Sequence, residues 1–173
     1  MTGKRPRPPL DDDSLRDLAL RYVGRFATSR AKLLAYLQRK LQERGWAGEG
    51  PPKPEQLVER FAELRYVDDR SFAVMKSAAL SRRGYGARRI DESLRAAGIE
   101  ASDREEAGNQ TSGESWTAAD RFARRKRLGP YAPAPLDPKQ REKAIAAFLR
   151  AGHSYETARR WTDASPGEPP EPA

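Results

Sequence analysis

Apolar residues recur along the chain with helical spacing, and one pattern occurs three times. In each copy an apolar residue is followed by a second one four positions later and by glycine four positions after that. The copies are Leu37-Leu41-Gly45, Ile90-Leu94-Gly98 and Ala144-Phe148-Gly152. A period of this kind, just above the roughly 20–50 residues of common repeats, accommodates about three helices and their turns. It predicts an all-α fold, an elongated array of three tandem three-helix repeats.

The first copy shows why the pattern indicates a helix that ends at glycine. Four leucines fall within about 100° of arc at roughly 3.6 residues per turn, and charged residues lie opposite them. The leucines are Leu33, Leu34, Leu37 and Leu41, and the charged residues are Lys32, Arg39 and Glu43. Gly45 stands where a helix end favours a left-handed backbone, which glycine adopts readily. The same reasoning applies to Gly98 and Gly152.

Residues that cap helix N-termini precede several of the expected helices. Asp11 to Ser14 provide such a start for the first helix, Ser29 for the second and Ser154 for the last. Residues 137–140 combine an aspartate N-cap, a proline at the first helical position and a glutamine at the third. Since no segment shows the period-two alternation of a strand, we expect helices alone.

The helical patterns divide the chain into three expected repeats, at residues 14–66, 67–115 and 116–164. Disordered tails are expected at 1–13, which is basic, and at 165–173. The inner faces of the first and fourth helices are predicted to contain Leu15, Leu18, Ala19, Tyr22 and Phe26, and Phe72, Met75 and Ala79. The last part of the second repeat, residues 100–115, has five acidic residues and almost nothing apolar to bury, so we expect a short frayed helix or an acidic linker.

Composition narrows the classes of function. Of 173 residues, 37% are hydrophobic and 34% charged, which suits thin helical layers better than one deep core. Without cysteine and with His153 as the one histidine, the chain has little material for a thiolate site, a metal site or a catalytic triad. No apolar run approaches the ~20 residues of a membrane span. We therefore expect a cytoplasmic protein with no catalytic residue, cofactor or metal, and no membrane partner.

Two short motifs could suggest chemistry, but each has a simpler explanation. Asp68-Asp69 could be a pair of metal-binding carboxylates, yet it lies where a helix begins, so capping is the preferred interpretation. Gly84-Tyr85-Gly86 lacks the further glycine, the strand and the Lys-Ser/Thr of a phosphate loop. It is interpreted as a tight turn. We expect His153 to be structural and the three tryptophans to pack between helices.

Basic clusters are the best candidates for a binding site. The net charge of +8 favours a polyanionic partner, and arginine forks bind phosphate and carboxylate groups alike. Tyr85 lies between two arginine pairs and could stack on a base or pack on a protein. The predicted binding residues are Arg82, Arg83, Tyr85, Arg88, Arg89, Arg121, Arg124, Arg125, Lys126 and Arg127. The alternative is a solvated helix face with ordinary salt bridges.

The chain resembles the RecX family, regulators of the RecA recombinase. The segments that carry this resemblance most specifically are residues 66–73 (YVDDRSFA), 82–90 (RRGYGARRI), 137–143 (DPKQREK) and 148–155 (FLRAGHSY). The likeness extends from about Leu15 to Trp161. It departs from the family pattern at residues 47–54, at 100–115 and at His153, where the family tends to have an aromatic residue.

The resemblance implies tandem three-helix repeats without enzymatic activity. It also implies binding to the RecA filament on single-stranded DNA, which restrains filament growth, ATP hydrolysis, strand exchange and co-protease function in DNA repair and the SOS response. We expect a monomer whose partners are RecA and single- or double-stranded DNA. Which arginines contact protein and which contact DNA stays open. The alternative is a helical protein that binds single-stranded DNA and acts on it directly; an enzyme such as a nuclease or NTPase has no supporting residues.

Overall fold

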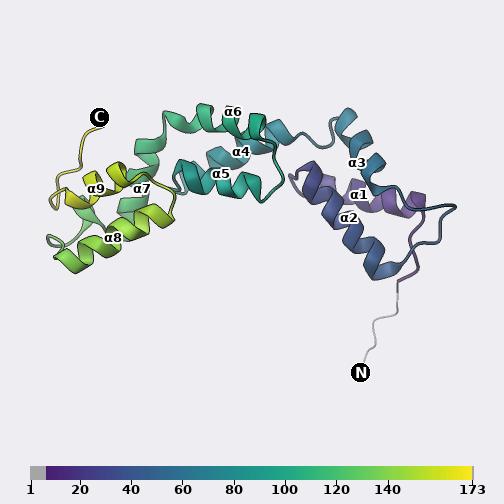
Figure 1. Cartoon of the computed structure of the whole chain (residues 1–173), viewed down its shortest axis with the longest axis horizontal. Helices are drawn as coiled ribbons and strands as arrows, with labels where there is room; N and C mark the ends of the chain where they lie inside the picture. The colour runs from purple at the N-terminus through teal and green to yellow at the C-terminus, as the bar shows by residue number, and fades with distance from the viewer. Residues whose placement is uncertain (1–6, 173) are drawn as a thin grey trace, which may run out of the picture. The chain divides into compact units, whose positions relative to one another are not determined.

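The computed structural model describes residues 7–172, and in that range it contains nine α-helices, one short 3-10 helix and no β-strand (Figure 1). The all-α prediction is therefore confirmed. The helices are α1 (Asp12–Arg25), α2 (Arg30–Arg44), α3 (Pro54–Glu63), α4 (Asp69–Arg82), α5 (Ala87–Arg95), α6 (Ala101–Ser112), α7 (Ser115–Lys126), η1 (Gly129–Tyr131), α8 (Pro138–Arg150) and α9 (Tyr155–Asp163). None of these helices combines the length and the apolar character needed to cross a bilayer.

The starts of the helices follow the local signals in the sequence. The Asp137 carboxylate accepts a hydrogen bond from Gln140 N at 2.7 Å, and the Gln140 side chain accepts one from Asp137 N at 3.0 Å. Asp11 and Ser14 form the same reciprocal box at α1. The Ser29 and Ser154 side chains cap α2 and α9. These predictions are confirmed because each motif satisfies backbone donors within its own first turn.

The three repeated glycines also have the expected backbone. Gly45, Gly98 and Gly152 have φ angles of 78°, 73° and 93°, in the left-handed region that L-residues rarely adopt. Each follows the helix that contains its apolar pair. The pattern recognised in the sequence is therefore a recurrent way of ending a helix.

The chain divides into two compact units. The first runs to Phe72 and includes Ala97–Ile99; the second contains Ala73–Ala96 and the chain from Glu100 onward. The core of the first unit packs α1, α2 and α3 around Leu10, Leu15, Ala19, Leu33, Leu37, Val58, Phe61 and Val67. A separate core in the second unit contains Ala119, Phe122, Ala123, Ile145, Phe148, Ala151, Ala158 and Trp161. The predicted division into three repeats stays a prediction.

The tails differ from the sequence-based expectation. Leu10 is fully buried; its N–H donates to Gly45 O at 2.9 Å, and its carbonyl accepts from Ala47 N at 2.7 Å. The predicted disordered tail at 1–13 is therefore wrong at Leu10. Residues 1–6 of that tail lie outside the described range. The C-terminal segment is irregular, yet Gly167 N donates to Pro130 O at 2.8 Å. In both places the tertiary fold supplies partners that a local pattern does not reveal.

Helix α4 buries only part of the predicted face: Phe72 is buried as expected, but Met75 is not. Met75 is 55% exposed, whereas Ala73, Ser77 and Ser81 are buried together with Phe72. Apart from Phe72, these buried residues are small, and Ser81 Oγ donates to Glu114 Oε2 at 3.1 Å. The spacing of apolar residues pointed to Met75, whereas the structure buries alanine and serine side chains. Phe26 is likewise 55% exposed at the end of α1 instead of facing inward.

The acidic stretch 100–115 forms a helix instead of a linker. Helix α6 has 12 residues and packs beside α5. Ala107 is fully buried, and Arg104 Nε donates to Asp91 Oδ1 of α5 at 2.8 Å. One buried alanine and an ion pair with the neighbouring helix therefore stabilise a segment that has little apolar surface of its own.

The backbone carbonyls that follow α5 and α8 each accept a hydrogen bond from the start of an earlier helix. In the first unit, Ser29 Oγ at the start of α2 donates to Ala97 O, at the turn after α5. In the second unit, Gly86 N at the start of α5 donates to Ala151 O at 2.9 Å, and Arg88 N donates to Gly152 O at 3.2 Å. The turn after α5 thus bonds to the start of α2, and the turn after α8 bonds to the start of α5.

Candidate functional site

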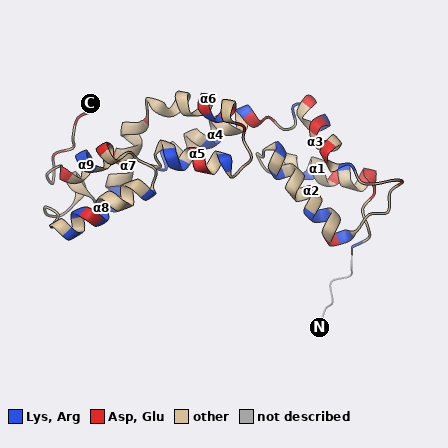
Figure 2. Ribbon diagram, in the orientation of Figure 1, with Lys and Arg blue, Asp and Glu red and all other residues tan. Residues whose placement is uncertain are grey.

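All ten predicted binding residues lie in the second unit, around the ends of three helices. Arg82 ends α4, Arg83 and Tyr85 follow it, and Arg88 and Arg89 lie in the first turn of α5. The other five, Arg121, Arg124, Arg125, Lys126 and Arg127, lie on α7 and at its end. Figure 2 shows blue Lys and Arg positions on α5 and on the neighbouring α8.

The structure brings four of the predicted residues together around one hollow. Arg83, Tyr85, Arg125 and Lys126 line an open hollow of about 530 Å³. Its remaining lining residues are Phe122, Ala147, Arg150 and Ala151. The lining thus contains four cationic side chains, an aromatic ring and a small apolar wall, and no carboxylate. We refer to these eight residues as the basic hollow.

Tyr85 holds two of the guanidinium groups in place. The Arg83 and Arg125 guanidinium carbons lie 5.5 and 5.8 Å from the centre of the Tyr85 ring, within the range of cation–π attraction. Arg125 also lies over the Phe122 ring at 5.5 Å and donates a hydrogen bond to Arg83 O. A guanidinium stacked on a ring keeps the N–H groups at its edge available for an anion.

In the described part of the chain, the four cations of the basic hollow have no carboxylate partner. Within residues 7–172, no ion pair joins Arg83, Arg125, Lys126 or Arg150 to an aspartate or glutamate. Many other arginines are paired, as Arg60 with Glu63 at 2.9 Å. The hollow is therefore a concentration of unneutralised positive charge in a chain that pairs charge widely elsewhere.

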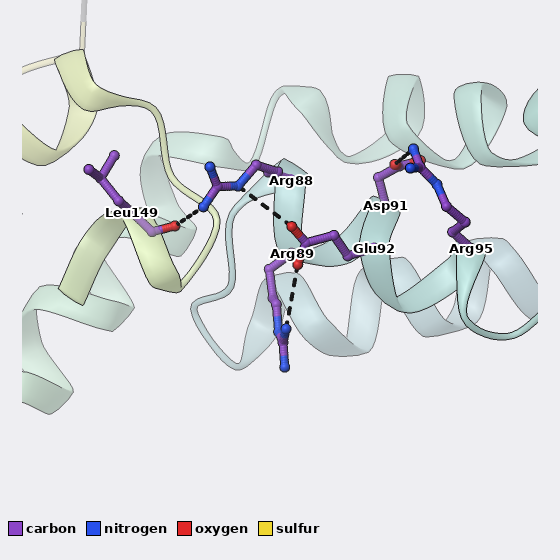
Figure 3. A network of polar contacts seen from close by, with 6 residues as sticks. All are labelled: Arg88, Arg89, Asp91, Glu92, Arg95 and Leu149. Carbon is purple, nitrogen blue, oxygen red and sulfur yellow. Dashed lines mark hydrogen bonds and ion pairs between the residues drawn. The ribbon is translucent and has the colours of Figure 1, made fainter. Parts of the chain in front are cut away.

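Arg88 and Arg89 belong to a different arrangement (Figure 3). Arg88 Nη2 donates to Leu149 O at the end of α8 at 2.6 Å, and its Nε lies 3.7 Å from Glu92. Arg89 Nη1 lies 3.4 Å from the other oxygen of Glu92. The structure therefore places Arg88 between α5 and α8, where it supports the packing of the second unit.

The remaining predicted residues lie outside the hollow. Arg124 pairs with Asp120 at 3.5 Å and donates to Tyr131 Oη at 2.9 Å. Burial and the hydrogen bond to Asp120 raise the pKa of Tyr131, so that ring keeps its proton. Arg82, Arg121 and Arg127 are exposed and have no ion pair among the described residues. They are available to a partner but are not oriented by neighbours.

Arg150 is the one cation of the hollow that the sequence analysis missed. It is an isolated arginine in the last turn of α8, where a basic residue is ordinarily explained by the helix dipole. Its sequence neighbours give no sign of the α4–α5 turn. Only the contact between that turn and the end of α8, through Gly86 N and Ala151 O, brings it beside Arg83.

His153 has a structural position, as expected. It is 6% exposed, its Nε2 donates to Gly84 O at 3.0 Å, and its ring packs on Phe122 and Phe148. Burial lowers the pKa of His153, an effect that the hydrogen bond to Gly84 opposes in part. The neutral ring thus joins the α4–α5 turn to the core of the second unit.

The position of His153 predicts that stability falls in mild acid. Because the pKa is lower in the folded state, the unfolded chain takes up the proton first as pH falls below about 6.5, which favours unfolding. Stability should be fully present above that pH and decrease below it. Urea unfolding at pH 7.5 and 5.5 should show this loss, and it should be smaller in His153→Phe. An equal loss in both proteins would contradict the assignment.

The carboxylates at the start of α4 act as caps. Asp68 Oδ1 accepts from Ser71 N at 2.9 Å, a bond that lowers the pKa of Asp68. Asp69 Oδ1 accepts from Arg30 N, at the start of α2, at 2.8 Å. In the part of the chain that the structure describes, no three His, Cys, Asp or Glu residues are grouped as metal ligands.

Comparison with known proteins identifies the family. No protein-family model matches the chain. The regulatory protein RecX of Myxococcus xanthus is 31% identical over an alignment of 173 positions that covers 94% of this chain and 91% of that protein. The regulatory protein RecX of Chlorobaculum tepidum is also 31% identical, over 86% of this chain and 88% of its own length.

Solved structures share the fold. A crystal structure of RecX from Lactobacillus salivarius matches with a TM-score of 0.61 and 17% identity, over 84% of this chain and 90% of that one. A crystal structure of a regulatory protein RecX matches with a TM-score of 0.64 and 20% identity, over 87% and 73%. With two relatives 31% identical over most of its length, the chain belongs to the RecX family of regulatory proteins.

Proposed function

We propose that this chain binds the RecA filament on single-stranded DNA and restrains its ATPase, recombinase and co-protease activities. The observation that carries the proposal is the 31% identity to a regulatory protein RecX over 94% of the chain. Membership of the family makes RecA the expected partner. The basic hollow supports a polyanionic target, since a filament on DNA exposes phosphate groups and acidic side chains.

We further propose that the chain regulates without catalysing a reaction. The relatives it matches are called regulatory proteins. Among the described residues, the carboxylates at the start of α4 are engaged as helix caps and the one histidine is buried against a backbone carbonyl. These groups are thereby occupied in structural roles, which agrees with a binding function.

The second candidate is a protein that binds single-stranded DNA directly and affects RecA only through the DNA. The unpaired cations of the basic hollow favour it, because they could neutralise phosphates without RecA. The two candidates differ in what they require. A filament binder needs RecA and nucleotide, whereas a DNA binder needs only DNA and loses affinity steeply with salt.

RecA ATP hydrolysis on single-stranded DNA separates the two candidates. We expect the chain to lower the rate when present at well below one molecule per RecA, since one bound regulator affects a filament of many subunits. The measurement is repeated at doubled DNA concentration. Inhibition by competition for DNA would disappear there, whereas inhibition through the filament should persist. An unchanged rate at equimolar chain would refute the proposed function.

A further inference from the structure

We infer that the end of α3 is a protein-contact surface, and that it binds an acidic side chain set beside apolar residues on the RecA filament. Three consecutive residues form this surface, Leu64, Arg65 and Tyr66, and we refer to them as the α3 end. The inference rests on the proposed function, in which the filament is the partner. It names a surface of the first unit, whereas the basic hollow belongs to the second.

Arg65 has a backbone conformation that costs stability. Its φ is 58°, in the left-handed region, where the Cβ of an L-residue crowds the following carbonyl oxygen. Arg65 N donates to Ala62 O and Tyr66 N donates to Phe61 O, each at 2.9 Å, which is a helix ending that glycine usually completes. Glycine would form the same two bonds without the strain, so the backbone gives no reason for an arginine.

Helix α8 ends with the same two bonds, but with glycine at the left-handed position. Gly152 N donates to Leu149 O at 3.0 Å, and His153 N donates to Phe148 O at 3.1 Å. A Cβ on Gly152 would lie 2.3 Å from Arg89 N, so close packing excludes a side chain there. The α3 end is exposed instead, and its left-handed position has room for a side chain that reaches a partner.

The Arg65 guanidinium forms no hydrogen bond or ion pair with another of the described residues. The neighbouring carboxylates are engaged elsewhere: Glu63 pairs with Arg60 at 2.9 Å, and Asp68 caps α4 by accepting from Ser71 N at 2.9 Å. A guanidinium binds a carboxylate through two parallel hydrogen bonds. The planar fork of Arg65 is therefore available to a carboxylate of another molecule.

A basic residue at this place is ordinarily explained by attraction to the C-terminal end of the helix. That attraction is usually weaker than the cost of a left-handed L-residue. Arg60 already supplies a positive charge in the last turn of α3. The helix dipole therefore does not account for an arginine at position 65.

Both neighbours of Arg65 present apolar surface to the solvent. Leu64 and Tyr66 are each exposed, although the Tyr66 ring also packs edge-on against Phe61, with 5.4 Å between the ring centres. Tyrosine and arginine are enriched at protein–protein interfaces, where surrounding apolar contacts exclude water from a central charged pair. The α3 end has this composition within three residues.

The local charge favours a protein over a nucleic acid as the ligand. Glu63 and Asp68 flank Arg65 in the sequence, so the segment has no excess of positive charge. A DNA strand presents a series of phosphates, which these carboxylates would repel. One acidic side chain, in contrast, needs a single arginine fork.

The test measures binding of the full chain to RecA filaments assembled on single-stranded DNA with a non-hydrolysable ATP analogue. The variant is Arg65→Gly, because glycine keeps the helix ending while it removes the guanidinium and the strain. We expect the first unit of the variant to melt roughly 2–8 °C higher than that of the wild type. Binding to the filament should nevertheless be at least ~10-fold weaker. A gain in stability excludes misfolding as the cause of lost binding.

Two further variants and a control define the contact. Arg65→Asn also tolerates a left-handed backbone, so it should lose as much binding as Arg65→Gly, which excludes glycine flexibility as the cause. Leu64→Ala should weaken binding roughly 3–10-fold through lost apolar contact. The matched control, Arg16→Gln, removes an exposed arginine of the same unit that pairs with Asp13, and it should bind like the wild type.

Four results would overturn the inference. The first is wild-type filament binding by Arg65→Gly, and the second is an equal loss in Arg16→Gln, because net charge would then explain binding. The third is an Arg65→Gly protein less stable than the wild type, since the arginine would then serve the helix ending. The fourth is an equal loss of binding to fluorescent oligo(dT) without RecA, because the ligand would then be DNA.

Inhibition of RecA ATP hydrolysis by the same proteins separates this inference from the proposed function. If the wild type inhibits and Arg65→Gly inhibits at the same concentration, the proposed function stands and the α3 end is not its contact. If the wild type neither binds the filament nor inhibits hydrolysis, the proposed function is refuted and the inference falls with it. Inhibition that only the Arg65 and Leu64 variants lose supports both.

Discussion

Gly86→Ala is expected to lower the melting temperature of the second unit by roughly 12–24 °C. A methyl group at Gly86 would overlap the backbone of Gly152 and His153. Backbone atoms cannot move aside as a flexible side chain does, so the cost should approach the upper end of overpacking penalties, about 3 kcal/mol. Because Gly86 has a φ of −82°, which alanine tolerates, the effect reports the overlap alone.

Thermal unfolding followed by circular dichroism checks this prediction. Gly108→Ala is the matched control, since Gly108 lies within α6 and an added Cβ there meets nothing within 4 Å. In a helix, alanine is more stable than glycine by about 0.5–1 kcal/mol, so the control should melt slightly higher. A Gly86→Ala protein that melts with the wild type would mean that the two turns are not closely packed.

The same substitution should weaken function. The contact at Gly86 positions the α4–α5 turn, which supplies Arg83 and Tyr85, against the end of α8, which supplies Arg150. If the turns separate, the basic hollow loses one of its sides. We therefore expect Gly86→Ala to bind oligo(dT) less tightly than Gly108→Ala at temperatures where both are folded.

Phe148→Ala is expected to destabilise the second unit by about 3–5 kcal/mol. Phe148 is fully buried, and its ring lies 4.8 Å from that of Phe122 and 5.4 Å from that of His153. Truncation removes both ring contacts and leaves a cavity that the backbone of three surrounding helices cannot fill. Urea unfolding at neutral pH gives the free energy of unfolding directly.

Two further variants define how specific that loss is. Phe148→Leu keeps most of the volume and should cost less than about 1.5 kcal/mol. Tyr155→Ala removes an aromatic ring that is 59% exposed and should change stability by less than about 0.5 kcal/mol. If all three variants lost the same free energy, the burial of Phe148 would not be the cause.

The ends of the helices are predictable from the sequence because their causes lie within a few residues. Asp137 and Gln140 satisfy each other's backbone donors, and no other part of the chain is needed. Gly152 adopts a φ of 93° because it has no Cβ, a property of the residue itself. The resemblance to RecX proteins rests on such short segments, and the comparisons confirm it.

The composition of the candidate site is only partly predictable. Arg83, Tyr85, Arg125 and Lys126 stand in visible basic clusters, and the structure brings them together. Arg88, which looks the same in the sequence, is instead bonded to Leu149 O of α8. Whether such an arginine lines the hollow or bonds to a neighbouring helix depends on the direction of its side chain relative to segments more than 20 residues away in the sequence. That these residues bind a partner stays a prediction.

The sequence by itself determined the capped starts of α1, α2, α8 and α9, the glycines that follow α2, α5 and α8, the absence of strands among the described residues, and the family to which the chain belongs. Capping, glycine conformation and short motifs are local. Only the tertiary structure decided which faces are buried. Met75 is exposed while Ser77 is buried, Leu10 leaves the expected tail for the core, and Arg150 joins Arg83 across the contact of two turns. Burial depends on segments that are distant in the sequence but close in the fold. The space between those segments limits the size of the side chain that can be buried, so hydrophobicity alone does not identify it.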